Sequence, residues 1–246
     1  MAILAGVLLA RAEPAAEDLT TSGIAEFSAA YQAWDGTRFA KAAELFRQAE
    51  AKTPETATNY YWHGAALFHQ MLQTGKTPDR GGGEDLMIAA LAALETAVKL
   101  DAGNAEAHAL LGTLYGMKIN DGILRALRYG PTVQAHQELA LKHGAENPRV
   151  RYLLGTGQFH TAKDAAGRRE ALNTLLVAVK LFEAEAKQPA KPFEPRWGYS
   201  SCLTFVGRSC ELLGLKTEAA AYYQKALDAH PADVIAKEGL VRLTGK

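Results

Sequence analysis

Residues 108–115 read HALLGTLY, and residues 217–231 read TEAAAYYQKALDAHP. The apolar residues of both stretches have the spacing of one face of an α-helix. In the second stretch the alanines allow a close approach to a neighbouring helix, Tyr223 fills the space beside them, and Pro231 ends the helix. Because neither stretch can bury its apolar face alone, both predict helices that pack against neighbouring units.

Similar stretches recur along the whole chain. The second kind is clearest in FAKAAELFRQAEAKTP at residues 39–54 and in LAALETAVKLDAGN at residues 91–104. The first kind is centred on a small residue, and its marker positions are Ala30, Gly64, Gly112, Gly155 and Gly207. This alternation resembles the tetratricopeptide repeat (TPR) family, whose pattern is W-x2-L-G-x2-Y, then A-x3-F, then P. The two stretches quoted first match that pattern closely, with His108 in the place of the tryptophan.

The resemblance implies an all-α, right-handed TPR-type solenoid of about five helix-turn-helix units. It also implies a C-terminal capping helix, at VIAKEGLVRL in residues 234–243. The marker positions are 34, 48, 43 and 52 residues apart, whereas the family has a period of about 34 residues. Long interhelical insertions are therefore expected at residues 70–85, 118–130 and 185–197. We expect the first to be a long glycine-containing loop and the second to hold an extra short helix.

The N-terminal stretch predicts export. Ala2–Ala10 is an apolar run, and Ala10, Arg11 and Ala12 have the small-x-small form of a signal peptidase site. We therefore interpret residues 1–21 as a signal remnant and linker, residues 22–246 as the solenoid domain, and the location as periplasmic or otherwise exported. The basic segment that should precede the run is absent, which keeps a cytoplasmic location open. No other apolar stretch approaches the roughly 20 residues that cross a bilayer, so we do not expect an integral membrane protein.

Charge and motifs argue against several other classes of protein. Lysine plus arginine and aspartate plus glutamate number 27 each, so the chain as a whole has no electrostatic attraction to nucleic acid. Gly75–Thr77 spells G-K-T, but Gln70 replaces the first glycine of a phosphate-binding loop. We find neither a catalytic constellation nor metal-ligand spacing in the sequence. We therefore expect a non-enzymatic protein without a cofactor or a metal.

The first helices of TPR units line a concave groove, and the resemblance transfers that role to particular positions. The groove is expected to be open, or to be filled by an insertion such as residues 118–130 that folds back into it. Chaperone adaptors of the family hold acidic peptide tails with lysines and asparagines, and the mostly apolar or aromatic lining here argues against that function. The candidate groove residues for a ligand or partner are Phe27, Tyr31, Trp34, Tyr61, Phe68, His69, Met117, Tyr152, Phe159, His160 and Arg208.

Two functions fit this lining. The first is an exported scaffold or adaptor that binds a protein or peptide partner in an envelope assembly. The alternative is a periplasmic carrier of an apolar small molecule, such as a lipid or sterol, held in the aromatic groove as part of a transport system. A carrier needs an enclosed cavity with Phe27, Tyr31, Phe68 and Phe159 facing into it, whereas an adaptor needs an open trough or an exposed apolar patch.

Overall fold

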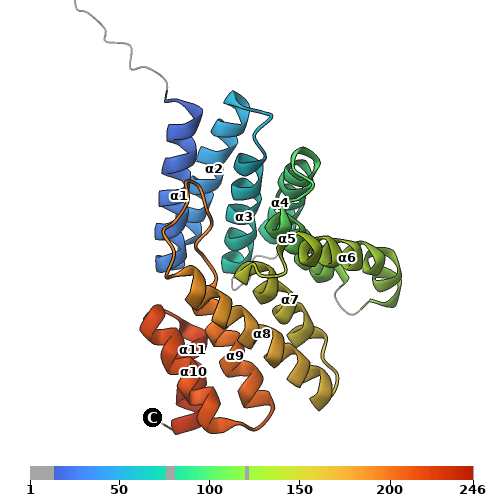
Figure 1. Ribbon diagram of the computed structural model, residues 1–246, viewed down its shortest axis with the longest axis vertical. Coiled ribbons are helices and arrows are strands. Elements are labelled where there is room, and N and C mark those ends of the chain that lie inside the picture. The colour runs from blue at the N-terminus through green and yellow to red at the C-terminus, as the bar shows by residue number, and fades with distance from the viewer. Residues whose placement is uncertain (1–13, 76–80, 120–121, 246) are drawn as a thin grey trace, which may run out of the picture.

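A computed structural model describes residues 14–75, 81–119 and 122–245 of the chain. All regular secondary structure in these residues is α-helical (Figure 1). The apolar run at residues 2–10 and the site after it lie outside the described residues. The helices are α1 (Ala16–Ala33), α2 (Gly36–Lys52), α3 (Ala57–Thr74), α4 (Gly81–Leu100), α5 (Ala105–Ile119), α6 (Ile123–Gly144), α7 (Pro148–Thr161), α8 (Ala165–Glu185), α9 (Tyr199–Leu212), α10 (Lys216–Ala229) and α11 (Val234–Thr244).

The helices form five consecutive antiparallel pairs, from α1 with α2 to α9 with α10, and α11 packs on the last pair. Figure 1 shows the pairs following one another in a curve, from α1 and α2 at the upper left, past α5 and α6 at the right, to α9 and α10 at the bottom. The prediction of a TPR-type solenoid with five units and a C-terminal capping helix is therefore confirmed. Helix α1 begins at Ala16, so the expected domain boundary at residue 22 falls inside it.

The marker glycines lie where the two helices of a unit touch. A Cβ atom added to Gly64 of α3 would be 2.5 Å from the Cγ atom of Leu94 in α4. A Cβ atom on Gly207 of α9 would likewise be 2.7 Å from the ring of Tyr223 in α10. These distances are shorter than van der Waals contact, so the close packing of these two pairs requires a glycine at the marker position.

Polar side chains fix several helix starts. The side chains of five residues that precede helices accept hydrogen bonds from backbone N–H groups of the first turn, which would otherwise have no partner. These capping residues are Asp35, Asn104, Asn147, Asp164 and Asp233. The helix boundaries are thereby set by local sequence, before any packing between units.

Two of the expected insertions differ from the prediction. The loop expected at residues 70–85 is shorter, because α3 continues to Thr74 and α4 begins at Gly81. The extra short helix expected within residues 118–130 is wrong, because Ile123–Gly144 is one helix that continues through Pro131. A proline removes only one N–H donor from a helix, and Pro131 is exposed to solvent, so the helix tolerates it. None of the described helices combines the length and the apolar character that crossing a bilayer requires.

Candidate functional site

The connection between α8 and α9 fills part of the groove. We call residues 186–198 the groove segment; in Figure 1 it passes in front of α1. The indole N–H of Trp62 donates a hydrogen bond of 3.0 Å to the backbone oxygen of Phe193. The indole N–H of Trp197 donates one of 3.1 Å to the phenol oxygen of Tyr61. The groove is therefore filled at its N-terminal end, by the third expected insertion and not by residues 118–130.

Trp197 completes an aromatic cluster beneath the groove segment. Its ring centroid lies 4.8 Å from that of His69, which also contacts the rings of Phe27 and Phe39 at 5.2 and 5.5 Å. Trp197 itself is only 3% exposed. Six of the candidate groove residues belong to this core: Phe27, Tyr61, Phe68 and His69 are buried, and Tyr31 and Trp34 are partly buried against it.

The His69 side chain is neutral in this core. Burial lowers the pKa of His69 to about 4, and the hydrogen bond of 2.8 Å between its Nδ1 atom and the Ala65 carbonyl raises that pKa only in part. The imidazole therefore acts as a packed aromatic ring at neutral pH, and a charged form would lack compensation there.

A buried ionic network lies next to Trp197. Arg149 of α7 is only 1% exposed, and its Nε atom donates to Glu106 of α5 at 2.7 Å. Its Nη1 atom donates to Glu185, the last residue of α8, at 2.9 Å. The Tyr61 hydroxyl also donates to Glu106. Burial opposes the charge on Arg149, but the attraction of Glu106 and the hydrogen bond to Glu185 outweigh it and raise the Arg149 pKa.

The sequence analysis did not predict this network, because charged residues such as Arg149, Glu106 and Glu185 usually lie on solvated helix faces. It holds together the second, third and fourth units and, through Tyr61, the groove segment. It therefore positions the groove segment and is not itself a ligand site.

A second aromatic group lies on α7 and α9, beyond the groove segment. We call Phe159, His160, Phe205 and Arg208 the α7–α9 patch. The Arg208 guanidinium lies over the rings of Phe159 and Phe205, 4.8 and 5.0 Å from their centroids. The two phenylalanine rings meet edge to face at 5.3 Å, and both are partly exposed. Three of the candidate groove residues, Phe159, His160 and Arg208, are thus brought together at the surface.

Arg208 forms no ion pair with an acidic side chain among the described residues, although its charge contributes to lowering the pKa of Glu211. Its nearest acidic neighbour on α9, Glu211, instead accepts from Arg242 at 3.1 Å and from the Tyr223 hydroxyl at 2.6 Å. Burial and the positive charge of Arg208 both lower the pKa of His160. The patch consequently presents one unpaired guanidinium between two apolar rings.

The last two candidate groove residues are Tyr152 and Met117, and neither belongs to the α7–α9 patch. Tyr152 of α7 lies between the two groups, with ring centroids 6.4 Å from Trp197 and 6.2 Å from Phe205. Met117 is 41% exposed near the end of α5 and belongs to neither group. Their role in binding, like that of the other candidates, stays a prediction. Phe205, which the prediction omitted, is the residue that joins Phe159, His160 and Arg208.

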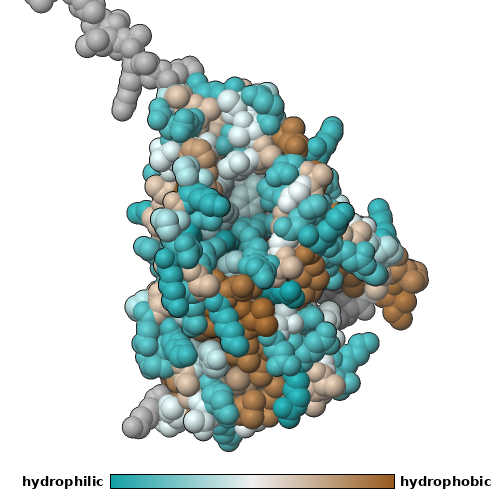
Figure 2. Space-filling model, viewed as in Figure 1, coloured by the Kyte–Doolittle hydropathy of each residue, from teal (hydrophilic) through white to brown (hydrophobic). Residues whose placement is uncertain are grey.

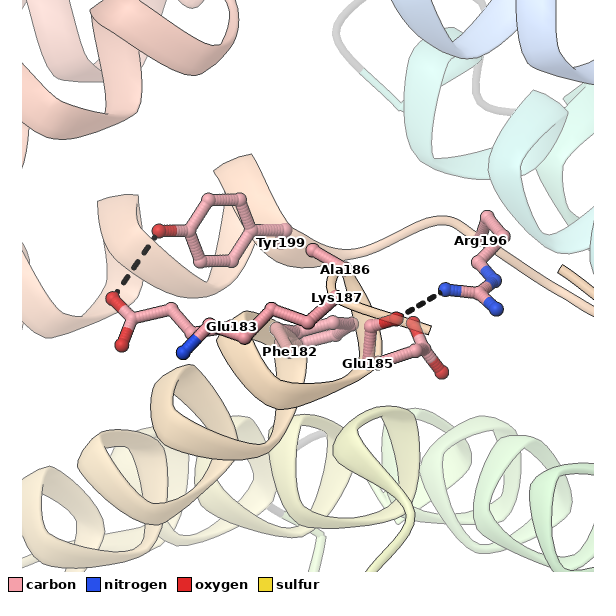
Figure 3. Close-up of a pocket in the computed structure, with 7 residues that line it drawn as sticks. All are labelled: Phe182, Glu183, Glu185, Ala186, Lys187, Arg196 and Tyr199. Carbon is pink, nitrogen blue, oxygen red and sulfur yellow. Dashed lines mark hydrogen bonds between the residues drawn. The ribbon is translucent and has the colours of Figure 1, made fainter. Parts of the chain in front are cut away.

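Two hollows adjoin the groove segment. One cavity of about 360 Å³ has Phe27, Tyr31 and Trp197 in its wall, but Phe68 and Phe159 do not line it. A carrier of the expected kind therefore has little support. The other hollow, of about 530 Å³, lies between the end of α8 and the start of α9 (Figure 3). There the Tyr199 hydroxyl donates to Glu183 at 3.4 Å, and Arg196 donates to the backbone oxygen of Glu185 at 2.6 Å, so these polar groups are already paired.

No metal site is formed in the part of the chain that the structure describes: no three His, Cys, Asp or Glu side chains come together there. Both cysteines, Cys202 and Cys210, are buried free thiols, and burial raises the pKa of Cys210 to about 11. The two thiols therefore lack the exposure and the lowered pKa of reactive cysteines.

Five helix pairs, marker glycines at their contacts and a lined concave face define a TPR solenoid of the kind that binds peptides or proteins. Residues 27–238 match the family described as "Regulator of microtubule dynamics protein 1-3". The chain belongs to this family.

Solved structures show the same fold. A thermophilic TPR protein of Thermus thermophilus, TTC0263, is 17% identical, with a TM-score of 0.66 over 94% of this chain and 100% of that one. A chain in the Cut9–Hcn1 hetero-tetramer of APC/C is 14% identical, with a TM-score of 0.66 over 93% of this chain. The present chain spans only 36% of that second protein chain. No curated protein sequence matches the chain significantly.

Proposed function

We propose that the protein is a non-enzymatic scaffold that binds a protein partner through the α7–α9 patch. The TPR fold supports binding of a peptide or protein, since members of this class present a concave surface to such partners. The observation that carries the proposal is the Arg208 guanidinium, which lies 4.8 Å from the Phe159 ring centroid and forms no ion pair among the described residues. With the N-terminal end of the groove filled, this patch is a part of the candidate groove that stays accessible and brings three of its residues together.

The geometry favours a carboxylate next to a large apolar side chain. A guanidinium stacked on aromatic rings keeps its N–H groups at the edge, where they match the two oxygens of a carboxylate. Phe159 and Phe205 offer partly exposed rings for an adjacent apolar side chain. A site with one arginine among aromatic rings recognises one acidic group. It differs in this from the lysine-lined groove that holds an acidic peptide tail.

The finer part of the proposal is that the partner belongs to an exported or envelope assembly. Its support is the apolar run at residues 2–10 followed by the small-x-small sequence. Binding by the α7–α9 patch does not depend on this location.

Selection of a displayed random peptide library on the purified protein tests the proposal. We expect enrichment of peptides that place an acidic residue, or the terminal carboxylate, beside a large apolar residue. Selection should fail on the Arg208→Gln variant and succeed on Arg169→Gln, a matched change at an exposed arginine of α8. Equal enrichment of the same peptides on both variants would contradict the assignment of the patch.

A further inference from the structure

The first turns of α6 carry the most exposed apolar side chains of the described residues. Ile123, Leu124 and Leu127 are 79%, 82% and 72% exposed, whereas Ile88, the next, is 56% exposed. They occupy the first turns of α6, which extends away from the other helices at the right of Figure 1. Figure 2 shows apolar side chains gathered over this projecting end. We call the apolar residues here, with Met117 at the end of α5, the α6 tip.

Basic residues surround the α6 tip. Arg125 and Arg128 are exposed on the same turns, and Lys118 lies at the end of α5. Lys118 and Arg128 approach the ring of Tyr129, at 5.0 and 5.2 Å from its centroid. The described residues 107–119 and 122–137 contain no aspartate or glutamate. The acidic residue nearest to them in the sequence is Asp121, and Glu95 of α4 accepts a hydrogen bond of 2.5 Å from Tyr115. Two arginines and one lysine at the tip therefore outnumber these carboxylates.

We propose that the α6 tip is a docking surface for an anionic phospholipid membrane. Aliphatic side chains on a projecting helix end can enter the boundary between headgroups and acyl chains, while flanking arginines and lysine bind lipid phosphates. Tyr129 adds an amphipathic aromatic ring of the kind favoured at that depth. The zero net charge of the whole chain does not oppose this, because attraction to a surface is set by the local charge within a Debye length.

Other occupants fit these features less well. Pairing with the tip of a second copy would bring like charges at Arg125 and Arg128 close to their equivalents. A folded protein partner needs a concave apolar pocket to receive three projecting side chains, whereas a lipid surface deforms around them. The aliphatic residues and the cations lie at the same end of the helix, which is the arrangement that a flat anionic surface requires.

Co-sedimentation of the full chain with vesicles tests the proposal. We expect binding to phosphatidylcholine vesicles that contain phosphatidylserine, weaker binding to pure phosphatidylcholine, and weakening by salt. The double variant Ile123→Glu with Leu127→Glu should bind at least about tenfold more weakly. The matched control, Ile88→Glu with Leu212→Glu, places the same substitutions at exposed positions of α4 and α9 and should bind as wild type does.

The double variant Arg125→Gln with Arg128→Gln separates the electrostatic contribution to vesicle binding from the apolar contribution. This variant should lose the preference for phosphatidylserine and keep the weak binding to neutral vesicles. Circular dichroism verifies that each variant is folded, which the exposure of the substituted side chains favours. The proposal is overturned if wild-type protein does not bind either vesicle, or if the tip variant binds as tightly as its control. If the wild-type protein bound no vesicles but bound an acidic protein that the tip variant did not bind, the tip would be assigned to a protein partner instead.

Discussion

The indole N–H of Trp197 donates a hydrogen bond to the hydroxyl oxygen of Tyr61, a residue 136 positions earlier in the chain. The Tyr61 hydroxyl in turn donates to Glu106, which binds Arg149. Burial and the negative charge of Glu106 both raise the pKa of Tyr61, so the phenol stays protonated and keeps donating. The groove segment is thus connected through side chains to three earlier helices of the solenoid, α3, α5 and α7.

Removing the Trp197 side chain tests this connection. The Trp197→Ala variant should lose about 3–5 kcal/mol of unfolding free energy, because the change leaves a cavity in the aromatic cluster. Trp197→Phe keeps most of the packing and loses the hydrogen bond to Tyr61, so it should cost less. Urea denaturation followed by circular dichroism measures both values. A Trp197→Ala variant as stable as wild type would show that the groove segment does not belong to the core.

The buried network makes a second prediction. The Arg149→Ala variant leaves Glu106 and Glu185 buried without their cation, so we expect it to lose about 3–5 kcal/mol of stability. Arg47→Ala is the control, since Arg47 forms an exposed ion pair with Glu44 at 2.6 Å. Exposed pairs of this kind contribute about 0–1 kcal/mol. Similar losses for the two variants, measured in the same denaturation experiment, would contradict the role given to the network.

The sequence predicted the parts of the fold that repeat. Gly64 and Gly207 lie at the same kind of helix contact in different units, so comparing the chain with itself reveals them. The position of the groove segment could not be predicted in this way. Its contacts, such as that of Trp197 with Tyr61, occur once and join residues far apart, so no periodicity marks them.

The same limit explains the mixed outcome for the candidate site. Family positions identified Phe159 and Arg208 on first helices, but they could not show that Phe27 and His69 are covered by an insertion. The family positions also could not show that Ile123 begins a helix that continues through Pro131. Proline is common in the first turn of a helix, so Pro131 indicated a helix start.

The buried His69 makes stability depend on pH. Its pKa is about 4 in the folded protein and about 6.5 in the unfolded chain, which therefore binds more protons between these values. Its contribution to stability is complete above pH 6.5 and is lost as the pH falls toward 4. The unfolding free energy should fall by about 2 kcal/mol from pH 7 to pH 5 through this residue.

The His69→Leu variant isolates that effect. Other histidines, such as His108 and His136, also have lowered pKa values, so the relevant quantity is the difference between the two proteins. We expect the variant to show a smaller loss of unfolding free energy between pH 7 and pH 5. Parallel pH profiles for variant and wild type would exclude a buried neutral His69.

Glycine substitutions test the packing of the helix pairs, because the change in stability should have opposite signs at packed and at open positions. Gly64→Ala places a Cβ atom 2.5 Å from Leu94, so overpacking should cost about 1–3 kcal/mol. Gly116→Ala in α5 meets no atom within 4 Å, so the higher helix propensity of alanine should raise stability by about 0.5–1 kcal/mol. Thermal denaturation of both variants gives the two signs. Changes of the same sign would argue against the described contact between α3 and α4.

The most direct measurement of the proposed function is calorimetric binding of one library-selected acidic peptide to wild type, Arg208→Gln and Arg169→Gln. Because a charge-assisted bidentate pair is lost, we expect Arg208→Gln to weaken binding by about 1.5–3 kcal/mol, which is roughly tenfold to more than a hundredfold. Arg169→Gln should bind the peptide as wild type does. Equal dissociation constants for the two variants would contradict the claim that the α7–α9 patch is the partner site.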